Sequence, residues 1–272
     1  MTLTLIGVSY RYAGAARPAL VDVTLEVEPG SVLGVVGANQ AGKSTLCLVA
    51  AGLAPATIGG RIEGRVEIDG AATGAMRPSD LAQRCGILFQ NAETQLSGTA
   101  ATVWEEVAFG PRNLSLPLPE VVERTEWALD VIGIESLAAR DPGRLSGGQA
   151  QLVALAAVLA MRPAYLALDE PTSQLDPLGT QLIGTALRRV ARDSGVGVLL
   201  VEHKTDLLSA IADECLALVA GSVAVAGPAA AVLADPRLDE WGIRPPSTVR
   251  ILRAGQAAGL SERVAAALSS PT

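Results

Sequence analysis

The chain has 272 residues, 49% of them hydrophobic, and carries a formal net charge of −7. That length suits one large domain or one domain with an appendage, and the acidic balance argues against non-specific binding of nucleic acid or anionic lipid. The three cysteines, Cys47, Cys85 and Cys215, are too widely spaced for a disulfide framework or a zinc site. We therefore expect reduced, buried thiols.

The first third of the chain predicts a small antiparallel sheet and the start of a parallel α/β unit. Residues 3–12 and 20–28 alternate apolar and polar side chains, as antiparallel strands do. An apolar run over 31–36 leads through a glycine-rich turn into an apolar helix over 43–52, an order that opens a parallel unit. Residues 61–69 alternate again and are expected to form an edge strand.

Strands and helices alternate along the middle of the chain. Residues 100–140 change in character and, with their prolines, are expected to form a helical insertion. Such alternation of strands and helices predicts a mostly parallel sheet covered on both faces. Short buried strands are expected at 86–90, 164–168 and 196–202, and helices at 120–132, 152–161 and 181–193.

An uncharged stretch of 20 residues, Cys215–Ala234, is long enough to span a bilayer. Gly221-Ser222 and Gly227-Pro228 interrupt it, so we expect two strands, 215–219 and 222–226, followed by a helical tail. The start of the chain lacks the basic residues and the long apolar run of a signal peptide.

A phosphate-binding loop is predicted directly after the strand 31–36. Gly37-Ala-Asn-Gln-Ala-Gly42-Lys43-Ser44 has P-loop spacing, in which glycines let successive backbone N–H groups point at phosphate oxygens. The following helix adds its N-terminal partial charge, Lys43 would bridge the β- and γ-phosphates, and Ser44 would bind Mg²⁺. We expect ATP and Mg²⁺ as cofactors, with the nucleotide contacting Gly37, Asn39, Gln40, Ala41, Gly42, Lys43, Ser44 and Thr45.

Two carboxylates end the buried strand 164–168. Because ligands bind at the carboxyl ends of parallel strands, Asp169 would lie beside the phosphate loop and hold Mg²⁺. Glu170 would orient or deprotonate an attacking water. An Asp-Glu pair after a strand is a weak signal by itself. It becomes a strong signal of a nucleotide site because a phosphate loop lies upstream.

The segment Leu145-Ser146-Gly147-Gly148-Gln149 precedes the apolar helix 152–161. A serine cap and two glycines at a helix N-terminus expose backbone N–H groups and form a second anion site. Because this site belongs to another helix, one chain need not direct both sites at the same ATP. On physical grounds alone, an ordinary capping turn explains the segment equally well.

Together these segments resemble the ATP-binding cassette (ABC) ATPases, whose signature is Leu-Ser-Gly-Gly-Gln. The resemblance covers about residues 3–228. It implies an α/β P-loop NTPase fold with a mostly parallel sheet core, an antiparallel β subdomain and a helical signature subdomain over about 91–160. Residues 1–228 would form this nucleotide-binding domain, and residues 229–272 a short C-terminal helical extension.

The resemblance also assigns roles to residues. Tyr12 would stack on adenine, Gln90 would sense Mg²⁺ and water, and His203 would contact the γ-phosphate during catalysis. Asp169 and Glu170 match the metal-binding aspartate and the catalytic glutamate, and residues 173–176 match the D-loop. The signature of a second subunit would complete the site through Ser146, Gly147, Gly148 and Gln149.

Two of these assignments depend on the family's spacing. A lone histidine is usually a structural residue, and His203 is the sole histidine of the chain. Tyr10 lies two residues from Tyr12 and points to the same face of the strand. We favour Tyr12 because its distance to the loop matches the family.

A narrower resemblance is to the energy-coupling factor (ECF) and cobalt-type importers. It rests on residues 89–95, 103–114 and the tail around 238–260. It implies a second ATPase subunit, identical or paralogous, and a transmembrane coupling subunit that carries a substrate-binding membrane component for a vitamin or a metal ion. Glu105 and Glu106 would face arginines of that coupling subunit, although two solvated acids on a helix would look the same.

The chain departs from the family at a few positions. Gln40 and Ala41 replace smaller or different residues of the loop, Gln174 stands where the D-loop usually has a small residue, and Leu152 replaces an arginine. No catalytic position is substituted, so we expect a competent ATPase.

We therefore expect a motor subunit at the cytoplasmic face of the membrane that dimerises around ATP and binds no nucleic acid. The alternatives are an ATPase of a binding-protein-dependent importer, a soluble ABC ATPase of repair or translation, and a non-enzymatic nucleotide switch. The soluble proteins carry coiled-coil insertions, zinc modules or two cassettes, which this sequence lacks. The switch is disfavoured by Glu170 and His203.

Overall fold

A six-stranded sheet forms the centre of the computed structural model, which describes residues 2–257. Its order is β10-β9-β3-β8-β7-β6, and all neighbours are parallel except β10, which pairs antiparallel with β9. This confirms the expected mostly parallel sheet and the two strands within 215–226. The strands are β3 (Val32–Val36), β6 (Cys85–Leu88), β7 (Tyr165–Asp169), β8 (Gly197–Val201), β9 (Glu214–Val219) and β10 (Ser222–Pro228).

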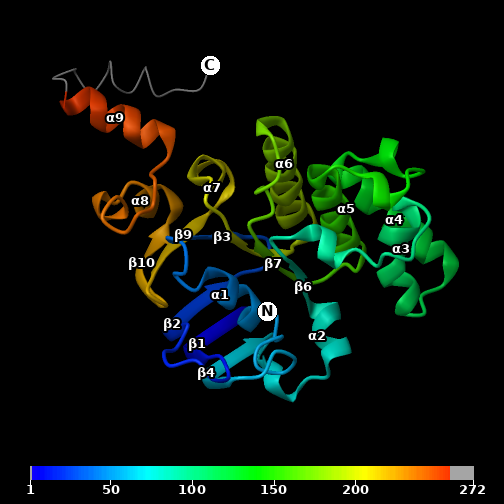
Figure 1. The fold of residues 1–272 in the computed structure, drawn as a ribbon, viewed down its shortest axis with the longest axis horizontal. Helices are drawn as coiled ribbons and strands as arrows, with labels where there is room; N and C mark the ends of the chain where they lie inside the picture. The colour runs from blue at the N-terminus through cyan, green and yellow to red at the C-terminus, as the bar shows by residue number, and fades with distance from the viewer. Residues whose placement is uncertain (1, 258–272) are drawn as a thin grey trace.

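A second, antiparallel sheet lies beside the first, with the order β2-β1-β4-β5. It consists of β1 (Leu3–Arg11), β2 (Leu20–Val27), β4 (Arg61–Ile68) and the two-residue β5 (Ala71–Ala72). Because β5 is so short, most of β4 behaves as the edge strand that its alternating pattern predicts. Helix α1 (Lys43–Ala50) lies between the two sheets and contacts both (Figure 1).

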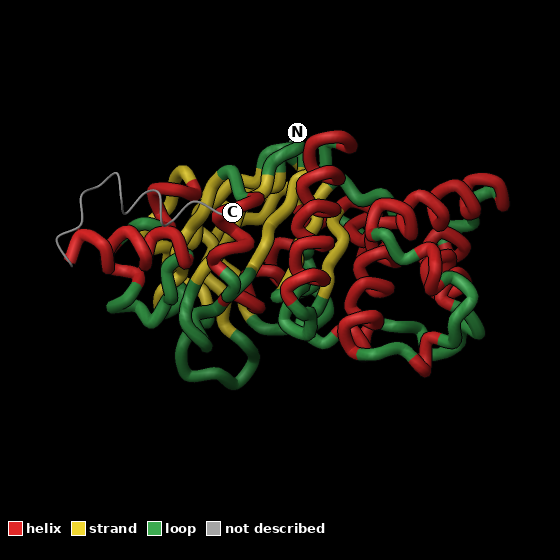
Figure 2. The backbone as a smooth tube through the Cα atoms, turned by 90° about the horizontal axis from the view of Figure 1, so that it is seen from above, coloured by secondary structure: helices red, strands yellow, loops and turns green. Residues whose placement is uncertain are grey.

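Two groups of helices lie at opposite ends of the molecule (Figure 1). Helices α3, α4 and α5 pack on one another at one end, and α8 and α9 lie at the opposite end (Figures 1 and 2). In residues 2–257, no helix is both long enough and apolar enough for a bilayer span. The helices are α2 (Pro78–Arg84), α3 (Val103–Asn113), α4 (Leu118–Ile132), α5 (Gly147–Ala160), α6 (Pro177–Ser194), α7 (Thr205–Ile211), α8 (Ala229–Leu233) and α9 (Ser247–Ala257).

Several boundaries differ from the sequence prediction, and three of them bear on the site. Helix α5 begins at Gly147 instead of 152, because Ser146 and Gln149 form a capping box ahead of the apolar run. Helix α6 begins at Pro177 instead of 181, because the Asp176 side chain accepts a hydrogen bond from the Gly179 N–H. Strand β6 ends at Leu88, so Gln90 lies in the following loop. Of the predicted C-terminal extension, residues 258–272 lie outside the described residues.

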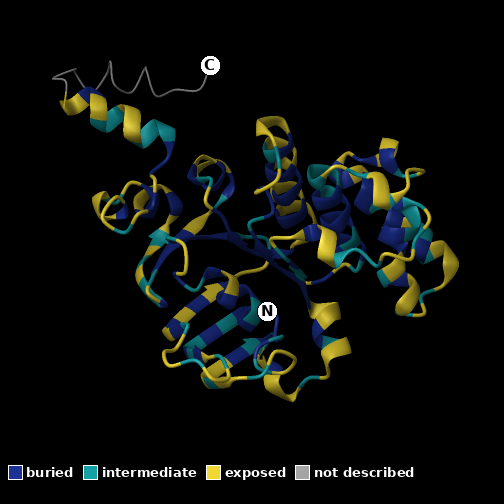
Figure 3. Cartoon of the chain, viewed as in Figure 1, coloured by how far each residue is buried: buried dark blue, intermediate teal, exposed yellow. Residues whose placement is uncertain are grey.

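The strands of the central sheet separate two hydrophobic cores (Figure 3). In β8, Val198 and Leu200 point into the core covered by helices α3 to α8, whereas Leu199 and Val201 point into the core shared with α1 and the antiparallel sheet. Every residue of β8 is buried, as expected for a parallel strand with both faces covered. The carboxyl ends of the parallel strands are therefore fixed at one edge of the sheet.

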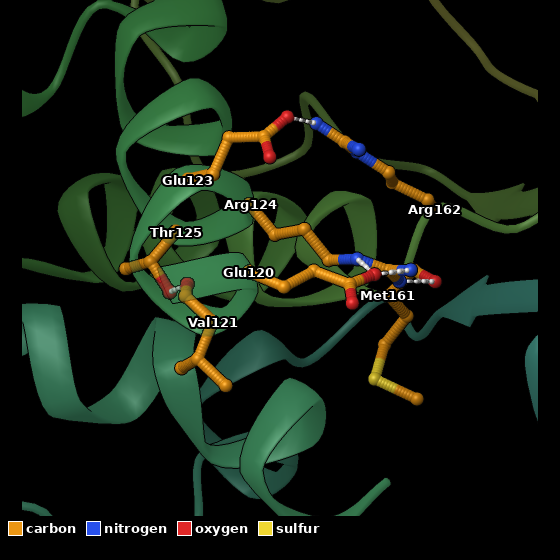
Figure 4. A network of polar contacts seen from close by, with 7 residues as sticks. All are labelled: Glu120, Val121, Glu123, Arg124, Thr125, Met161 and Arg162. Carbon is orange, nitrogen blue, oxygen red and sulfur yellow. Dashed lines mark hydrogen bonds and ion pairs between the residues drawn. The ribbon is translucent and has the colours of Figure 1, made fainter. Parts of the chain in front are cut away.

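A polar network joins α4 to the C-terminal end of α5 (Figure 4). Arg124 donates to the Glu120 carboxylate at 2.6 and 3.0 Å and to the carbonyl oxygen of Met161 at 3.2 Å. Arg162 donates to Glu123 at 2.8 Å. These contacts hold the helical end of the molecule together around the helix whose N-terminus carries the Leu-Ser-Gly-Gly-Gln segment.

Candidate active site

The phosphate loop joins β3 to α1 through close backbone contacts. A Cβ atom on Gly42 would lie 2.5 Å from the carbonyl oxygen of Ala19, and a Cβ on Gly37 would lie 2.7 Å from that of Leu218. Gly42 has φ 103° and Gln40 has φ 64°, both in the left-handed region. The glycines at the two ends of the motif are thus required by space, and at Gly42 also by backbone conformation.

Lys43 is buried against the loop that it follows. Its Nζ atom donates to the carbonyl oxygens of Gly37 at 2.9 Å and Ala38 at 3.0 Å. Burial lowers the pKa of the Lys43 ammonium, while the carboxylates of Glu170 and Asp169 raise it. A phosphate in the loop would offer this ammonium a stronger, charge-assisted partner than two carbonyls.

Asp169 ends β7 beside the loop. It is 6% exposed, its Oδ1 atom has no hydrogen-bond partner, and the Ser44 hydroxyl donates to its carboxylate. Burial raises the pKa of Asp169, an effect that the Ser44 hydrogen bond opposes. A buried carboxylate oxygen without a partner, next to a serine hydroxyl, fits a hard cation such as Mg²⁺, which prefers oxygen ligands.

The raised pKa of Asp169 predicts that Asp169→Asn stabilises the nucleotide-free protein. The unfolded chain ionises this carboxyl more readily than the folded one, so its ionisation at pH 7 costs stability. We expect the variant to unfold at a higher temperature than the wild type at pH 7. The gain should be constant above the folded-state pKa, shrink below it, and vanish below the unfolded value of about 3.9. Thermal scans over a range of pH measure this.

The same variant should lose most of the stabilisation that Mg–ATP gives the wild type. That stabilisation is about 2.7 kcal/mol at a hundredfold excess of ligand over its Kd. A variant less stable than the wild type at pH 7, without nucleotide, would show that Asp169 already has a structural partner in the free protein.

Three polar side chains meet at the carboxyl ends of β6, β7 and β8. Gln90 Nε2 donates to Glu170 Oε2 at 2.8 Å, and His203 Nε2 lies 3.0 Å from Glu170 Oε1. Glu170 has φ 51°, which turns it away from the line of β7, and its N–H bonds the carbonyl oxygen of Val201 at 3.0 Å. The structure therefore brings together the three residues that the sequence predicts as catalytic.

The Leu-Ser-Gly-Gly-Gln segment lies against residues 174–175 of its own chain. A Cβ on Gly148 would lie 3.1 Å from Leu175 Cδ2, and a Cβ on Gly147 would collide with the Gln174 side chain. Within the described residues, no hydrogen bond joins 145–149 to the phosphate loop 37–45. The segment thus forms the capped helix N-terminus that the sequence predicts, and its role as an anion site stays a prediction.

A match to a family model identifies the protein family to which this chain belongs. The model of the ABC transporter family matches residues 20–173, which include the phosphate loop, the segment 145–149 and both carboxylates at the end of β7. The chain belongs to the ABC transporter family. It is an ATP-binding, ATP-hydrolysing subunit of an ABC transporter.

Two relatives define the branch within the family. The chain is 41% identical to the cobalt import ATP-binding protein CbiO of Rhodobacter capsulatus, over 89% of this chain and 84% of that protein. It is 40% identical to the energy-coupling factor transporter ATP-binding protein EcfA1 of Lacticaseibacillus paracasei, over 73% and 69%. The resemblance to the ECF and cobalt-type ATPases is confirmed.

Solved structures support the same assignment. CbiO1 from Clostridium perfringens, part of the ABC transporter complex cbiONQ, aligns with a TM-score of 0.78 and 30% identity, covering 95% of this chain and 98% of that one. The ATP-binding cassette MJ0796, in a dimeric post-hydrolysis state bound to ADP and Pi, aligns with a TM-score of 0.73 and 26% identity, covering 84% and 99%. The predicted ABC ATPase fold is confirmed.

The structure separates the two candidate adenine residues of this ABC ATPase. Tyr10 is fully buried and its hydroxyl bonds the carbonyl oxygen of Gly59. Tyr12 follows β1, is partly exposed, and its hydroxyl lies 3.1 Å from Thr45 Oγ1. The Tyr10 ring meets the Tyr12 ring edge-on at 4.9 Å. Tyr12 is thus the ring next to the phosphate loop that a base can reach.

Glu105 and Glu106 have partners within the chain, which the sequence analysis did not foresee. Glu106 is 4% exposed, and its two oxygens accept from the N–H and the hydroxyl of Ser97, both at 2.6 Å. Glu105 forms the capping box of α3 with Thr102. The alternative of two solvated acids is wrong for Glu106, whose carboxylate is buried and held by Ser97. Glu105 is half-buried, and the hydrogen bonds that its side chain accepts are to the Oε2 atom.

Two residues that support the site, Lys204 and Glu202, were not identified from the sequence. Lys204 Nζ donates to the carbonyl oxygens of Thr172 and Leu175, at 2.8 and 3.1 Å, which fixes the chain after Glu170. The buried Glu202 accepts from Thr172 Oγ1 at 2.7 Å and from the His203 N–H at 3.0 Å. The sequence contains one sign that Lys204 has a specific role, because it is one of only two lysines in the chain.

Proposed function

We propose that the chain is the motor of an ECF-type importer, in which two ATPase subunits close around ATP and the cargo is a vitamin or a metal ion. The observation that carries this is the assembled cluster of Gln90, Glu170 and His203 beside Asp169, whose buried oxygen lacks a partner. A non-enzymatic nucleotide switch would not need these three side chains in contact.

Different residues bind different parts of the nucleotide. Tyr12 stacks on adenine, the loop N–H groups bind the phosphates, and Lys43 bridges the β- and γ-phosphates. Ser44, Asp169 and Gln90 would hold Mg²⁺, which supplies charge neutralisation on the phosphates when bound. The loop contacts are those of Gly37, Asn39, Gln40, Ala41, Gly42, Lys43, Ser44 and Thr45.

Glu170 performs the proton step. In the nucleotide-free structure its carboxylate contacts both Gln90 and His203. With Gln90 still donating to one oxygen, the other oxygen can orient a water and accept its proton. His203 is 43% exposed at its side chain and can turn from Glu170 towards the γ-phosphate once nucleotide enters. Catalysis then consists of positioning and charge stabilisation.

The second subunit supplies the signature. In this chain the segment 145–149 lies against its own D-loop, without a bond to its own phosphate loop. Ser146 and Gly148 of the partner subunit would contact the γ-phosphate, flanked by Gly147 and Gln149. The dimeric MJ0796 cassette supports such closure. Hydrolysis removes the bridging phosphate, and the different affinity of the open and closed states drives the membrane partner.

An apolar groove offers a docking site for that partner. It is a cavity of about 280 Å³ between the loop after β6, α3 and α5, and Phe109 lines it while 46% exposed. A helix of a transmembrane coupling subunit, itself bound to the substrate-binding component, would place its apolar face here at the cytoplasmic face of the membrane. The groove supports this docking better than Glu106, whose two carboxylate oxygens are held by Ser97.

Co-purification from membranes tests the proposed function. The tagged chain should recover a multi-spanning coupling subunit together with a small substrate-binding membrane protein. Phe109→Asp should reduce recovery at least about tenfold, the equivalent of 1.4 kcal/mol. Leu118→Asp, at a 69% exposed apolar residue outside the groove, is the matched control and should not. Recovery of a permease with a soluble binding protein would favour the other importer class.

A further inference from the structure

A second cavity of about 1020 Å³ lies between α6, α7 and the segment that leads into α9. Its wall includes apolar side chains from all three: Leu175 and Pro177 at the start of α6, Leu207 and Ile211 of α7, and Pro245. Helices α6 and α7 stand side by side here (Figure 1). No residue of the phosphate loop lines it, whereas His203 of the catalytic cluster does, so the cavity borders the ATP site on the side away from the loop.

Five arginines line the same cavity, and Arg189 is the one among them that has ion pairs. Of the other four, Arg188 and Arg192 are one turn apart on α6, Arg244 precedes α9, and Arg250 lies in its first turn. Among residues 2–257, none of these four guanidinium groups has a salt bridge or a side-chain hydrogen bond. The wall thus carries four arginines without an ion pair, together with two aspartates.

The other charged groups of the wall are occupied. Asp206 accepts from the N–H and hydroxyl of Ser247, both at 2.7 Å, and Asp193 lies 4.0 Å from Arg189. The Lys204 ammonium is held by two carbonyl oxygens and by Thr180 Oγ1. Asp206 is thus held by hydrogen bonds, whereas Asp193 makes a long ion pair at an exposed position.

The wall of this cavity has a positive net charge that a bound anion would complement. The chain carries a net charge of −7, yet five arginines and one lysine outnumber the two aspartates that line this cavity, so its field attracts anions. Guanidinium groups bind phosphate through paired, charge-assisted hydrogen bonds. An apolar wall with a few convergent polar groups is the usual composition of a small-molecule site, and such sites span about 300–1,000 Å³.

We propose that this cavity is a binding site for an organic phosphate, a small molecule with a phosphate group for the arginines and a flat apolar body for the wall. The site is distinct from the phosphate loop and adds a ligand to those that the ATPase cycle requires. His203 and Lys204 border it, so the ligand lies next to the catalytic cluster without belonging to it.

Flavin mononucleotide is a suitable probe because its ring is fluorescent and it carries one phosphate. Its binding to the full chain is measured by fluorescence anisotropy with Mg–ADP saturating the phosphate loop. We expect saturable binding to the wild type, and at least a tenfold rise in Kd for the double variant Arg188→Gln, Arg192→Gln. Riboflavin, which lacks the phosphate, should bind at least tenfold more weakly to the wild type and respond little to the two substitutions.

The double variant Arg61→Gln, Arg65→Gln is the matched control, since it removes the same charge from the exposed strand β4. It should bind the probe like the wild type. Arg188 and Arg192 are exposed, so both double variants should keep the wild-type unfolding temperature. Absence of saturable flavin mononucleotide binding below about 1 mM, or an unchanged Kd in the Arg188, Arg192 variant, would overturn the proposal.

Discussion

Glu170→Gln is expected to lower ATP turnover by about 10²–10⁴-fold, the range of a general base, and to leave ATP binding intact. Glutamine has the same shape and can still accept the hydrogen bond from Gln90 and contact His203, so the geometry of the cluster survives. What is lost is the carboxylate that takes the proton of the attacking water. Phosphate release and nucleotide titration measure the two effects separately.

The same substitution should trap the closed state. With hydrolysis blocked, ATP–Mg²⁺ should convert the purified chain into a dimer that light scattering detects, whereas ADP should not. Glu63→Gln, on the exposed strand β4, removes an equal charge and should keep both turnover and the monomer. Undiminished turnover in Glu170→Gln would falsify the catalytic role. A monomer that binds ATP would point to a different second subunit, or to the membrane partner as the clamp.

The sequence predicts the centre of this fold well because the relevant signals are local. A strand, a glycine loop and a helix lie within about 20 residues, and each is encoded by its own side-chain pattern. The meeting of Gln90, Glu170 and His203 is also predictable, although 113 residues separate the first from the last. All three follow parallel strands, and the carboxyl ends of parallel strands share one edge of a sheet.

The missed features depend on contacts between segments that no local pattern connects. Glu106 looks like a solvated acid next to Glu105, and only the path of the preceding loop places Ser97 against it. Lys204 reaches back about 30 residues to the carbonyl oxygens of Thr172 and Leu175. Neither the hydropathy pattern nor the residue spacing indicates the contact of Glu106 with Ser97 or the contacts of Lys204.

The predicted starts of α5 and α6 were wrong because each helix begins directly after its capping residue, several residues before its apolar run. Ser146 and Gln149 form a capping box, so α5 starts within the Leu-Ser-Gly-Gly-Gln segment and not after it. The consequence is functional, since Gly147 and Gly148 become the first turn of a helix whose N–H groups point outward. That is the position from which backbone N–H groups bind an anion.

The position of Ser146 allows the composite site to be tested with a matched pair of variants. Ser146→Asp and Ser146→Asn both place a good N-cap side chain on α5, and they differ in charge alone. Within the described residues, Ser146 makes no hydrogen bond to the phosphate loop of the same chain. We therefore expect both variants to bind ATP as monomers with the wild-type Kd.

The two should differ only when the dimer closes. In the Glu170→Gln background, an aspartate at 146 would face the γ-phosphate of the partner's ATP, and like charges in an interface cost several kcal/mol. We expect ATP-dependent dimerisation to weaken at least about a hundredfold for Ser146→Asp and to persist for Ser146→Asn, as measured by light scattering against concentration. Equal dimerisation of the two would place the signature away from the γ-phosphate. Weakened ATP binding in the Ser146→Asp monomer would instead mean that the signature acts on the ATP of its own chain.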